Sequence, residues 1–297
     1  MGHPTVSVVI PCYNSGSYVI DAVESATKQD GDFILNEIIV IDDHSDDGAT
    51  LNALKELQGR QLVKIIPNKF SKGPGGARNM GIEMVQSEWI AFLDADDILL
   101  PNSVAARVNA LSRHPDINWC GGDFVKLYPD GSRSEPVYSS GQKHSPAFDG
   151  YDFNEPLLIK NPVKYFFSRM LTWLGAVLIR TEVLRKIGGF NVALLHSQDA
   201  NLFIRIALEY DFLFIPDLTF IRRLHANSHT KRESSPKEWP IKNFKTFLND
   251  ERFNPHHKLI RRMISGFYKE NAKFHIRHHR RIKGLIDRAE YLFFRYL

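Results

Sequence analysis

Residues 89–101, "WIAFLDADDILLP", place three carboxylates directly after a run of apolar residues. Asp94, Asp96 and Asp97 stand where a buried strand would end. Aspartate is a poor strand former, and an uncompensated carboxylate at the edge of a core costs several kcal/mol. The segment is therefore either an acidic turn or a place where something cationic balances the charge.

Strand-like and helix-like segments alternate upstream of these carboxylates. Short apolar or β-branched runs, typical of buried strands, occupy residues 6–11, 37–42, 63–67 and 89–94. Helical spacing of apolar residues lies between them, at 18–27, at 45–57 with Ser45 or Asp46 as the cap, and at 77–86. This order predicts an α/β fold with a largely parallel sheet covered by helices.

Polar residues follow the strand ends, which is where such sheets bind ligands. The candidates are Pro11, Tyr13 and Asn14 after the first strand, Asp42 and Asp43 after the second, and Asp94, Asp96 and Asp97 after the fourth. Taken singly, each group is also what turns and helix caps contain. Two carboxylates two residues apart can share a hard divalent cation that keeps positions open for diphosphate oxygens.

A glycine-rich segment, "SKGPGGARNMG" at residues 71–81, follows the third strand. Its glycines would let the backbone approach a phosphate, or they form a flexible connection. No Gly-Lys-Ser/Thr follows, and no Gly-x-Gly-x-x-Gly follows the first strand. A P-loop and a dinucleotide-binding fingerprint are therefore excluded.

Composition is that of an ordinary globular protein, with 43% hydrophobic and 24% charged residues and a mean hydropathy of −0.27. The first residues lack the pattern of a secretory signal, and no apolar run is long enough for a transmembrane helix. Cys12 and Cys120 lie in apolar stretches and are expected to be reduced core thiols. We therefore expect a cytoplasmic protein.

The C-terminal part is basic. Residues 251–297 contain 12 Lys or Arg and 4 Asp or Glu, although the whole chain has a net charge of only +4. Two segments, 257–274 and 281–297, have amphipathic helical spacing. Their apolar stripes either pack on the rest of the protein or form a surface for an anionic bilayer or a partner. Nothing else in the chain indicates nucleic-acid binding.

Taken in order, "VSVVIPCYN", "IIVIDDHSDDGA", "GPGGARNMGI" and "WIAFLDADD" resemble the nucleotide-binding half of family 2 glycosyltransferases, which are inverting enzymes with the GT-A fold. The resemblance continues through residues 175–191, 196–208 and 220–230. It implies a GT-A catalytic domain at 1–230, with a nucleotide-sugar half at 1–100 and an acceptor half at 101–230. Residues 231–297 would form a basic, amphipathic helical extension.

The resemblance also implies roles for individual residues. Tyr13, with Pro11 and Asn14 beside it, would pack on the nucleobase, and Asp43, with Asp42, would accept the uracil N3–H. Gly76 and Arg78 would lie near the nucleotide. Asp94, Ala95 and Asp96 match the Asp-x-Asp motif, in which Asp96 binds Mn²⁺ or Mg²⁺ and Asp94 contacts ribose or sugar; Asp97 is an alternative to Asp96. His225 would reach the metal or the diphosphate.

Asp199 matches the catalytic base, which takes the proton of the acceptor hydroxyl as its oxygen attacks the anomeric carbon. The family's neighbouring acids are replaced here by Gln198 and Asn201, so the alternative is that His196 assists. Gln198 and Trp173 are acceptor-side candidates, and Trp173 is equally compatible with core packing. Residues 129–172, rich in Gly, Ser and Pro, are interpreted as an acceptor-side flap.

The sequence thus predicts a metal-dependent inverting glycosyltransferase. It would move a hexose or N-acetylhexosamine from a UDP-sugar to a hydroxyl of a glycan acceptor, one sugar per encounter. A lipid-linked acceptor and contact of residues 255–297 with the inner face of the cell membrane would fit the basic tail. The alternative is a non-catalytic nucleotide-sugar-binding or scaffold protein. A haloacid-type phosphatase and a nucleotidylyltransferase are disfavoured, because their motifs are missing after the first strand.

Overall fold

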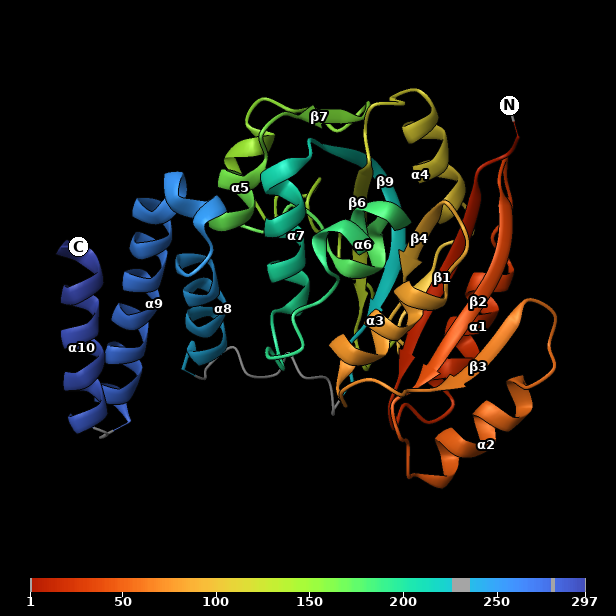
Figure 1. The fold of residues 1–297 in the computed structure, drawn as a ribbon, viewed down its shortest axis with the longest axis horizontal. Coiled ribbons are helices and arrows are strands. Elements are labelled where there is room, and N and C mark those ends of the chain that lie inside the picture. The colour runs from red at the N-terminus through yellow and green to blue at the C-terminus, as the bar shows by residue number, and fades with distance from the viewer. Residues whose placement is uncertain (1, 226–235, 279–280, 297) are drawn as a thin grey trace. The chain divides into compact units, whose positions relative to one another are not determined.

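The computed structural model describes residues 2–225, 236–278 and 281–296 (Figure 1). The chain divides into two compact units, one of residues 1–192 with 202–226 and one of residues 193–201 with 227–297. Residues 226–230, part of the segment that resembles the end of the family's core, lie outside the described residues.

The first unit is built on a nine-stranded sheet with the order β3-β2-β1-β4-β8-β6-β9-β5, and β7 pairs with β9 outside this path. The strands are β1 (Thr5–Cys12), β2 (Ile34–Asp42), β3 (Val63–Pro67), β4 (Trp89–Phe92), β5 (Ile98–Leu99), β6 (Trp119–Leu127), β7 (Leu157–Ile159), β8 (Val177–Arg180) and β9 (Phe212–Arg223). Strands β3, β2, β1 and β4 are parallel, whereas β8 is antiparallel to both of its neighbours. The predicted α/β fold is confirmed, and the sheet is parallel in its first half and mixed beyond β4.

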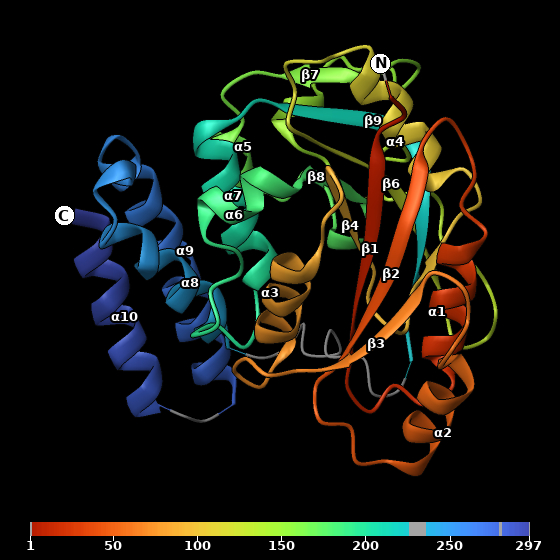
Figure 2. The same cartoon turned by 45° about the vertical axis from the view of Figure 1, so that its right-hand side comes forward.

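Three helices connect the first four strands, as predicted: α1 (Tyr18–Thr27), α2 (Gly48–Leu57) and α3 (Pro74–Met84). Figure 2 shows α1 and α3 on opposite sides of β1 and β2. Sandwiched strands must be apolar on both faces, and Val8, Val9 and Ile10 of β1 are fully buried. The predicted cap of α2 was wrong: Asp47, rather than Ser45 or Asp46, accepts the Thr50 N–H at 2.8 Å.

Four more helices complete the sequence up to residue 209: α4 (Ser103–Ser112), α5 (Val163–Ser168), α6 (Thr181–Ile187) and α7 (Gln198–Glu209). Both cysteines are buried and free, as expected. Burial raises the pKa of Cys12 to about 11 and that of Cys120 to about 12.

The segment at residues 129–172 is more ordered than its composition indicates. It contains a 3₁₀ turn at Pro146–Phe148, strand β7 and helix α5. The buried carboxylate of Asp123 on β6 fixes its first part, because it accepts the N–H groups of Tyr138 and Ser139 at 2.9 and 2.8 Å and the Ser139 hydroxyl at 2.9 Å. Asp123 went unnoticed in the sequence.

The second unit is helical. Its elements are α8 (Glu238–Leu248), a 3₁₀ segment (Glu251–His256), α9 (His257–Arg277) and α10 (Arg281–Tyr296). The two predicted amphipathic helices are confirmed, while α8 was not predicted. Ile260 and Ile264 of the α9 stripe are fully buried. Within the described ranges, no helix is long and apolar enough to cross a bilayer.

Candidate functional site

The loop after β1 is fastened to the loop after β2 through Asn14. Its side chain donates to Asp46 Oδ1 at 2.7 Å and accepts the Asp46 N–H at 3.0 Å, and its φ of 47° lies in the left-handed region, which asparagine tolerates. Tyr13 next to it is 48% exposed, and Lys72 Nζ lies 4.7 Å from the centre of its ring. The structure thus presents Tyr13 at the surface, where a nucleobase could stack, and gives Asn14 a loop-fixing role.

Asp43 organises the glycine-rich loop. It is buried, and its two carboxylate oxygens accept hydrogen bonds from Asn68 Nδ2 at 2.6 Å and from the Gly73 N–H at 2.7 Å. Asp42 is half-buried and accepts the Ser45 N–H at 3.1 Å. Asn68 was missed in the sequence, although its place just after the third strand repeats the pattern of polar residues at strand ends.

The glycine-rich loop leads into α3, and two of its positions have a backbone conformation or a close contact that favours glycine. Gly73 has a φ of 116°, and a Cβ added at Gly76 would lie 1.8 Å from the Ser71 carbonyl oxygen. One turn further, Arg78 is buried, and its Nη2 donates to Asp94 Oδ1 at 2.6 Å. The loop therefore positions the guanidinium of Arg78 beside Asp94, the first carboxylate of the Asp-x-Asp motif.

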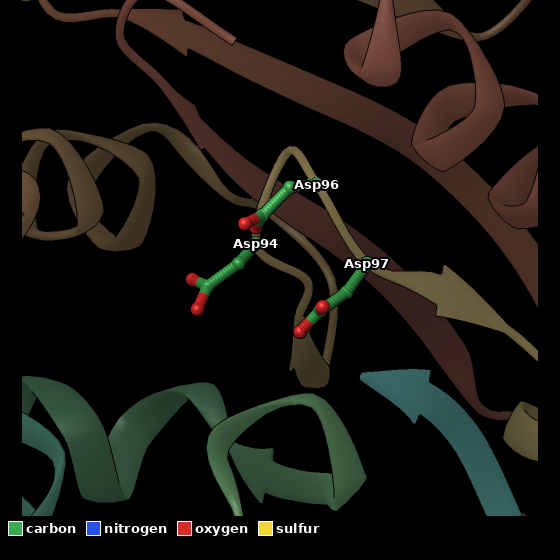
Figure 3. Close-up of side chains that lie close together, drawn as sticks. All are labelled: Asp94, Asp96 and Asp97. Atoms are coloured by element: carbon green, nitrogen blue, oxygen red, sulfur yellow. The ribbon is translucent and has the colours of Figure 1, made fainter. Parts of the chain in front are cut away.

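Asp94, Asp96 and Asp97 converge at the turn that follows β4. Figure 3 shows their carboxylates on the same side of the turn, and one oxygen of each lies within 4.8 Å of the others. Asp97 is only 4% exposed, and burial, followed by the charges of Asp96 and Asp94, holds its pKa well above the usual range. Ala95 between them is buried and brings no functional group to the cluster.

Pairing of β5 with β9 brings the end of β9 to this turn. Ile98 and Leu99 pair antiparallel with Ile221 and Phe220, so residues before 98 face residues after 221. The Arg223 N–H accordingly donates to Asp97 Oδ1 at 2.9 Å, and His225 Nε2 lies 2.8 Å from Asp96 Oδ2. The structure therefore brings together Asp96 and His225, which are 129 residues apart in the sequence.

The donor set of this cluster fits a hard divalent cation. Three carboxylates supply oxygen ligands of the kind that Mg²⁺ and Mn²⁺ prefer, and an imidazole nitrogen beside Asp96 is an additional donor that suits Mn²⁺. Asp96 with Asp94 or Asp97 would hold the ion, and His225 would complete its coordination or orient Asp96. A bound ion would neutralise charge on a diphosphate.

His225 also contributes to a cavity of about 360 Å³. Its ring stacks on Tyr18 with 5.4 Å between centres, and the other lining residues include Tyr128 and Arg223. This cavity could not be predicted from the sequence, because its walls come from α1, the end of β6 and the end of β9.

Trp173 is half-buried and lies against two cations. Lys143 Nζ and the Arg222 guanidinium carbon are each 4.4 Å from its ring centre, and Phe124 packs at 5.8 Å. Arg222 is also close enough to Asp97 to lower the pKa of that carboxyl against the larger upward effects. Trp173 thus has both a core side and a charged side, and neither Lys143 nor Arg222 was singled out in the sequence.

The remaining candidates belong to the second unit. Asp199 lies in the first turn of α7, and Gln198 is buried with its amide donating to the Leu194 carbonyl. Asn201, which replaces a family acid, is buried and donates to Asn243 Oδ1 at 2.8 Å. His196 packs edge to face on Trp239 at 5.0 Å. Asp199 is therefore the carboxylate of this segment, and its two altered neighbours have packing roles.

Comparison with known sequences identifies relatives along most of the chain. An uncharacterized glycosyltransferase of Methanocaldococcus jannaschii is 28% identical over 257 residues, 85% of this chain and 82% of that protein. A Rickettsia felis uncharacterized glycosyltransferase is 27% identical over 246 residues, and the match spans 79% of this chain but 36% of the relative. Escherichia coli WfgD, named a UDP-Glc:α-D-GlcNAc-diphosphoundecaprenol β-1,3-glucosyltransferase, is 29% identical over 119 residues, 40% of this chain and 45% of WfgD.

Solved structures share the fold at low sequence identity. The crystal structure of S. aureus TarS 1–349 superposes with a TM-score of 0.62 at 18% identity, covering 90% of this chain and 72% of TarS. The TarS complex with UDP-GlcNAc gives a TM-score of 0.61 at 19% identity, covering 92% and 72%. The model of Glycosyl transferase family 2 matches residues 7–188, which is more than half of the chain. With the mixed sheet and the Asp-Ala-Asp turn already described, the chain belongs to glycosyl transferase family 2 and has its GT-A fold.

Proposed function

We propose that the protein transfers a hexose or N-acetylhexosamine from a UDP-sugar to a hydroxyl of a glycan acceptor, with inversion and one sugar at a time. The observation that carries the proposal is the cluster of Asp94, Asp96 and Asp97, with oxygens within 4.8 Å of one another, joined to Arg78 and His225. Such a cluster can hold Mn²⁺ or Mg²⁺ against a diphosphate. Residues 1–230 would act as the catalytic domain and 231–297 as its extension.

The donor would bind at the ends of β1, β2 and β4. Tyr13 offers an exposed ring to the base, and Asp42 and Asp43 are acceptors for the uracil N3–H. Since both oxygens of Asp43 accept internal hydrogen bonds, the half-buried Asp42 is the more open of the two. Arg78 balances charge beside the diphosphate. The UDP and UDP-GlcNAc complexes of TarS support a uridine donor.

On the acceptor side, Asp199 would accept the proton of the attacking hydroxyl. Trp173, with Lys143 and Arg222 over its ring, would line the acceptor side. The diphospholipid acceptor in the name of WfgD supports a lipid-linked glycan. Such acceptors are assembled on membranes, so we place the protein in the cytoplasm, at the inner face of the cell membrane.

Release of UDP from a panel of UDP-sugars, with Mn²⁺ or with EDTA, tests the proposal on the wild type and on Asp96→Ala. Asp116→Ala, at an exposed aspartate remote from the cluster in sequence, is the matched control. We expect metal-dependent release from one donor, a loss of about 10²–10³-fold in Asp96→Ala and no loss in the control. Absence of both release and metal-dependent UDP binding in the wild type would refute the donor site.

The Asp199→Ala variant tests the role of the catalytic base independently of donor binding. Once an acceptor has been identified with the donor found above, the variant should bind UDP like the wild type but lose transfer by about 10²–10⁴-fold. Equal transfer rates for variant and wild type would exclude Asp199 as the base.

The second candidate function, a non-catalytic binding protein, is favoured by the loss of the acids at positions 198 and 201, whose side chains are engaged in packing. Calorimetry distinguishes the two. The protein would be mixed with the UDP-sugar and, in turn, with each acceptor of a panel of lipid-diphosphate sugars. If it binds the UDP-sugar but releases no UDP with any acceptor, the binding protein is favoured.

A further inference from the structure

Helix α10 carries apolar side chains on two opposite faces. One face packs on α9: Phe294 stacks on Tyr268 with 5.9 Å between ring centres, and Ser265 donates to the Tyr291 carbonyl at 3.1 Å. A Cβ at Gly284 would lie 2.9 Å from Ile276 Cγ1, so the absence of a side chain there allows the close approach. This face accounts for the pairing of the two helices.

The opposite face is exposed. Leu285, Ile286, Leu292 and Phe293 are 66, 57, 44 and 58% exposed. Residues spaced i, i+1, i+7 and i+8 lie on one side of a helix, so these four side chains form one exposed apolar stripe. Exposed apolar patches of this kind mark interaction sites in soluble proteins. We name this group of four residues the α10 apolar face.

The charges around the α10 apolar face select the kind of partner. Lys283, Arg288 and Arg295 are exposed on the same helix, where they outnumber the half-buried Asp287 and Glu290, and residues 251–297 carry three times as many Lys and Arg as Asp and Glu. An apolar helix face bordered by cations complements an anionic bilayer, where acyl chains receive the apolar side chains and lipid phosphates attract the cations. A self-association surface would need the apolar face but would be opposed by the positive charge of both copies.

We propose that α10 docks on an anionic membrane surface, with Leu285, Ile286, Leu292 and Phe293 inserted below the headgroups and Lys283, Arg288 and Arg295 at the lipid phosphates. The helix lies along the surface rather than across it. This inference deepens the proposed function and rests on it for its purpose, because it brings the enzyme to a lipid-linked acceptor. Vesicle binding itself can be measured without turnover.

The test is co-sedimentation of the full chain with vesicles of phosphatidylcholine, with or without phosphatidylglycerol. We expect binding to the anionic vesicles only, weakened by salt, and at least about tenfold weaker in Leu285→Glu/Phe293→Glu. The matched control is Leu51→Glu/Met84→Glu, which makes the same charge change at two side chains of 39% exposure on α2 and α3. This control should bind like the wild type.

Three results would overturn the proposal. They are no vesicle binding by the wild type, equal loss in the test and control variants, and equal binding of the wild type and Leu285→Glu/Phe293→Glu. If the wild type does not bind vesicles but is a dimer that becomes monomeric in Leu285→Glu/Phe293→Glu, the α10 apolar face is a self-association surface. UDP release by the same samples keeps the two proposals apart. If the wild type releases UDP but does not bind vesicles, only the membrane proposal is rejected. If it binds vesicles but releases no UDP, only the catalytic assignment is rejected.

Discussion

At the scale of single residues, Gly76 leaves no room for one added carbon. Its Cβ would meet the Ser71 carbonyl oxygen at 1.8 Å, a backbone atom that cannot rotate away. Gly76→Ala should therefore destabilise the protein by about 1–3 kcal/mol and displace the loop that Asp43 holds. Urea unfolding measures the free energy, and UDP binding reports the loop.

Gly48→Ala is the control for this substitution. Gly48 is the first residue of α2, and nothing lies within 4 Å of its added Cβ. We expect no loss of stability, and a gain of up to about 1 kcal/mol, because alanine restricts the unfolded chain more than glycine does. Equal destabilisation by both changes would show that the contact with Ser71 is not the cause.

The two cysteines provide a second prediction at this scale. Burial raises their pKa values to about 11 and about 12, so at pH 8 both thiols stay protonated and shielded in the folded protein. Iodoacetamide should label neither Cys12 nor Cys120 in native buffer and both in urea, as read by mass spectrometry. Fast labelling of the native protein would contradict the buried position of these thiols.

At the scale of elements, the segment after β6 depends on one carboxylate. Asp123→Asn replaces an acceptor of the Ser139 N–H and hydroxyl, or of the Tyr138 N–H, with a donor. The buried mismatch should cost about 1–3 kcal/mol and free the segment, so trypsin should cleave faster after Arg133 and Lys143.

Asp130→Asn serves as the comparison, since Asp130 is exposed on the neighbouring turn. Its cleavage pattern should match that of the wild type. If Asp123→Asn also keeps the wild-type pattern, the segment is held by its aromatic cluster, such as Phe148 on Phe214 at 4.7 Å, rather than by the carboxylate.

The elements also show what sequence patterns can predict. Apolar runs located β1 to β4, and the residues that follow these strands, Tyr13, Asp43 and Asp94, lie at the edge where parallel strands end. The cap of α2 was misplaced because "DDHSDDG" offers several equivalent oxygens. Helix α8 was missed because Pro240 stands in its first turn and reads as a helix breaker.

The unpredicted parts of the site depend on long-range pairing. The role of Asp123 could not be predicted, because its partners Tyr138 and Ser139 lie in a segment whose apolar residues show no helical or strand periodicity. Trp173 and the two cations beside it, Lys143 and Arg222, come from three distant places in the chain, and only the register of β9 puts Arg222 there. The resemblance to the family suggested His225, whereas the spacing of residues alone could not pair it with Asp96.

At the scale of the whole molecule, ligand binding should raise stability through mass action. If the acidic cluster holds a metal and a uridine diphosphate, UDP with Mn²⁺ at about 100 times the dissociation constant should add about 2.7 kcal/mol to the free energy of unfolding. Thermal unfolding with UDP, with Mn²⁺ and with both measures this. In Asp96→Ala, the gain in unfolding free energy that requires both UDP and Mn²⁺ should be lost. If the gain is unchanged, Asp96 does not bind the metal.

The short pairing of β5 with β9 also sets the order in which the protein can be completed during translation. The first four strands leave the ribosome early, yet Asp97 receives its hydrogen bond from the Arg223 N–H, 126 residues later. Until then, the turn that holds the three carboxylates lacks the pairing of β5 with β9. A nascent chain therefore carries an unfinished acidic turn while those 126 residues are added, and the site is completed only once β9 has been made.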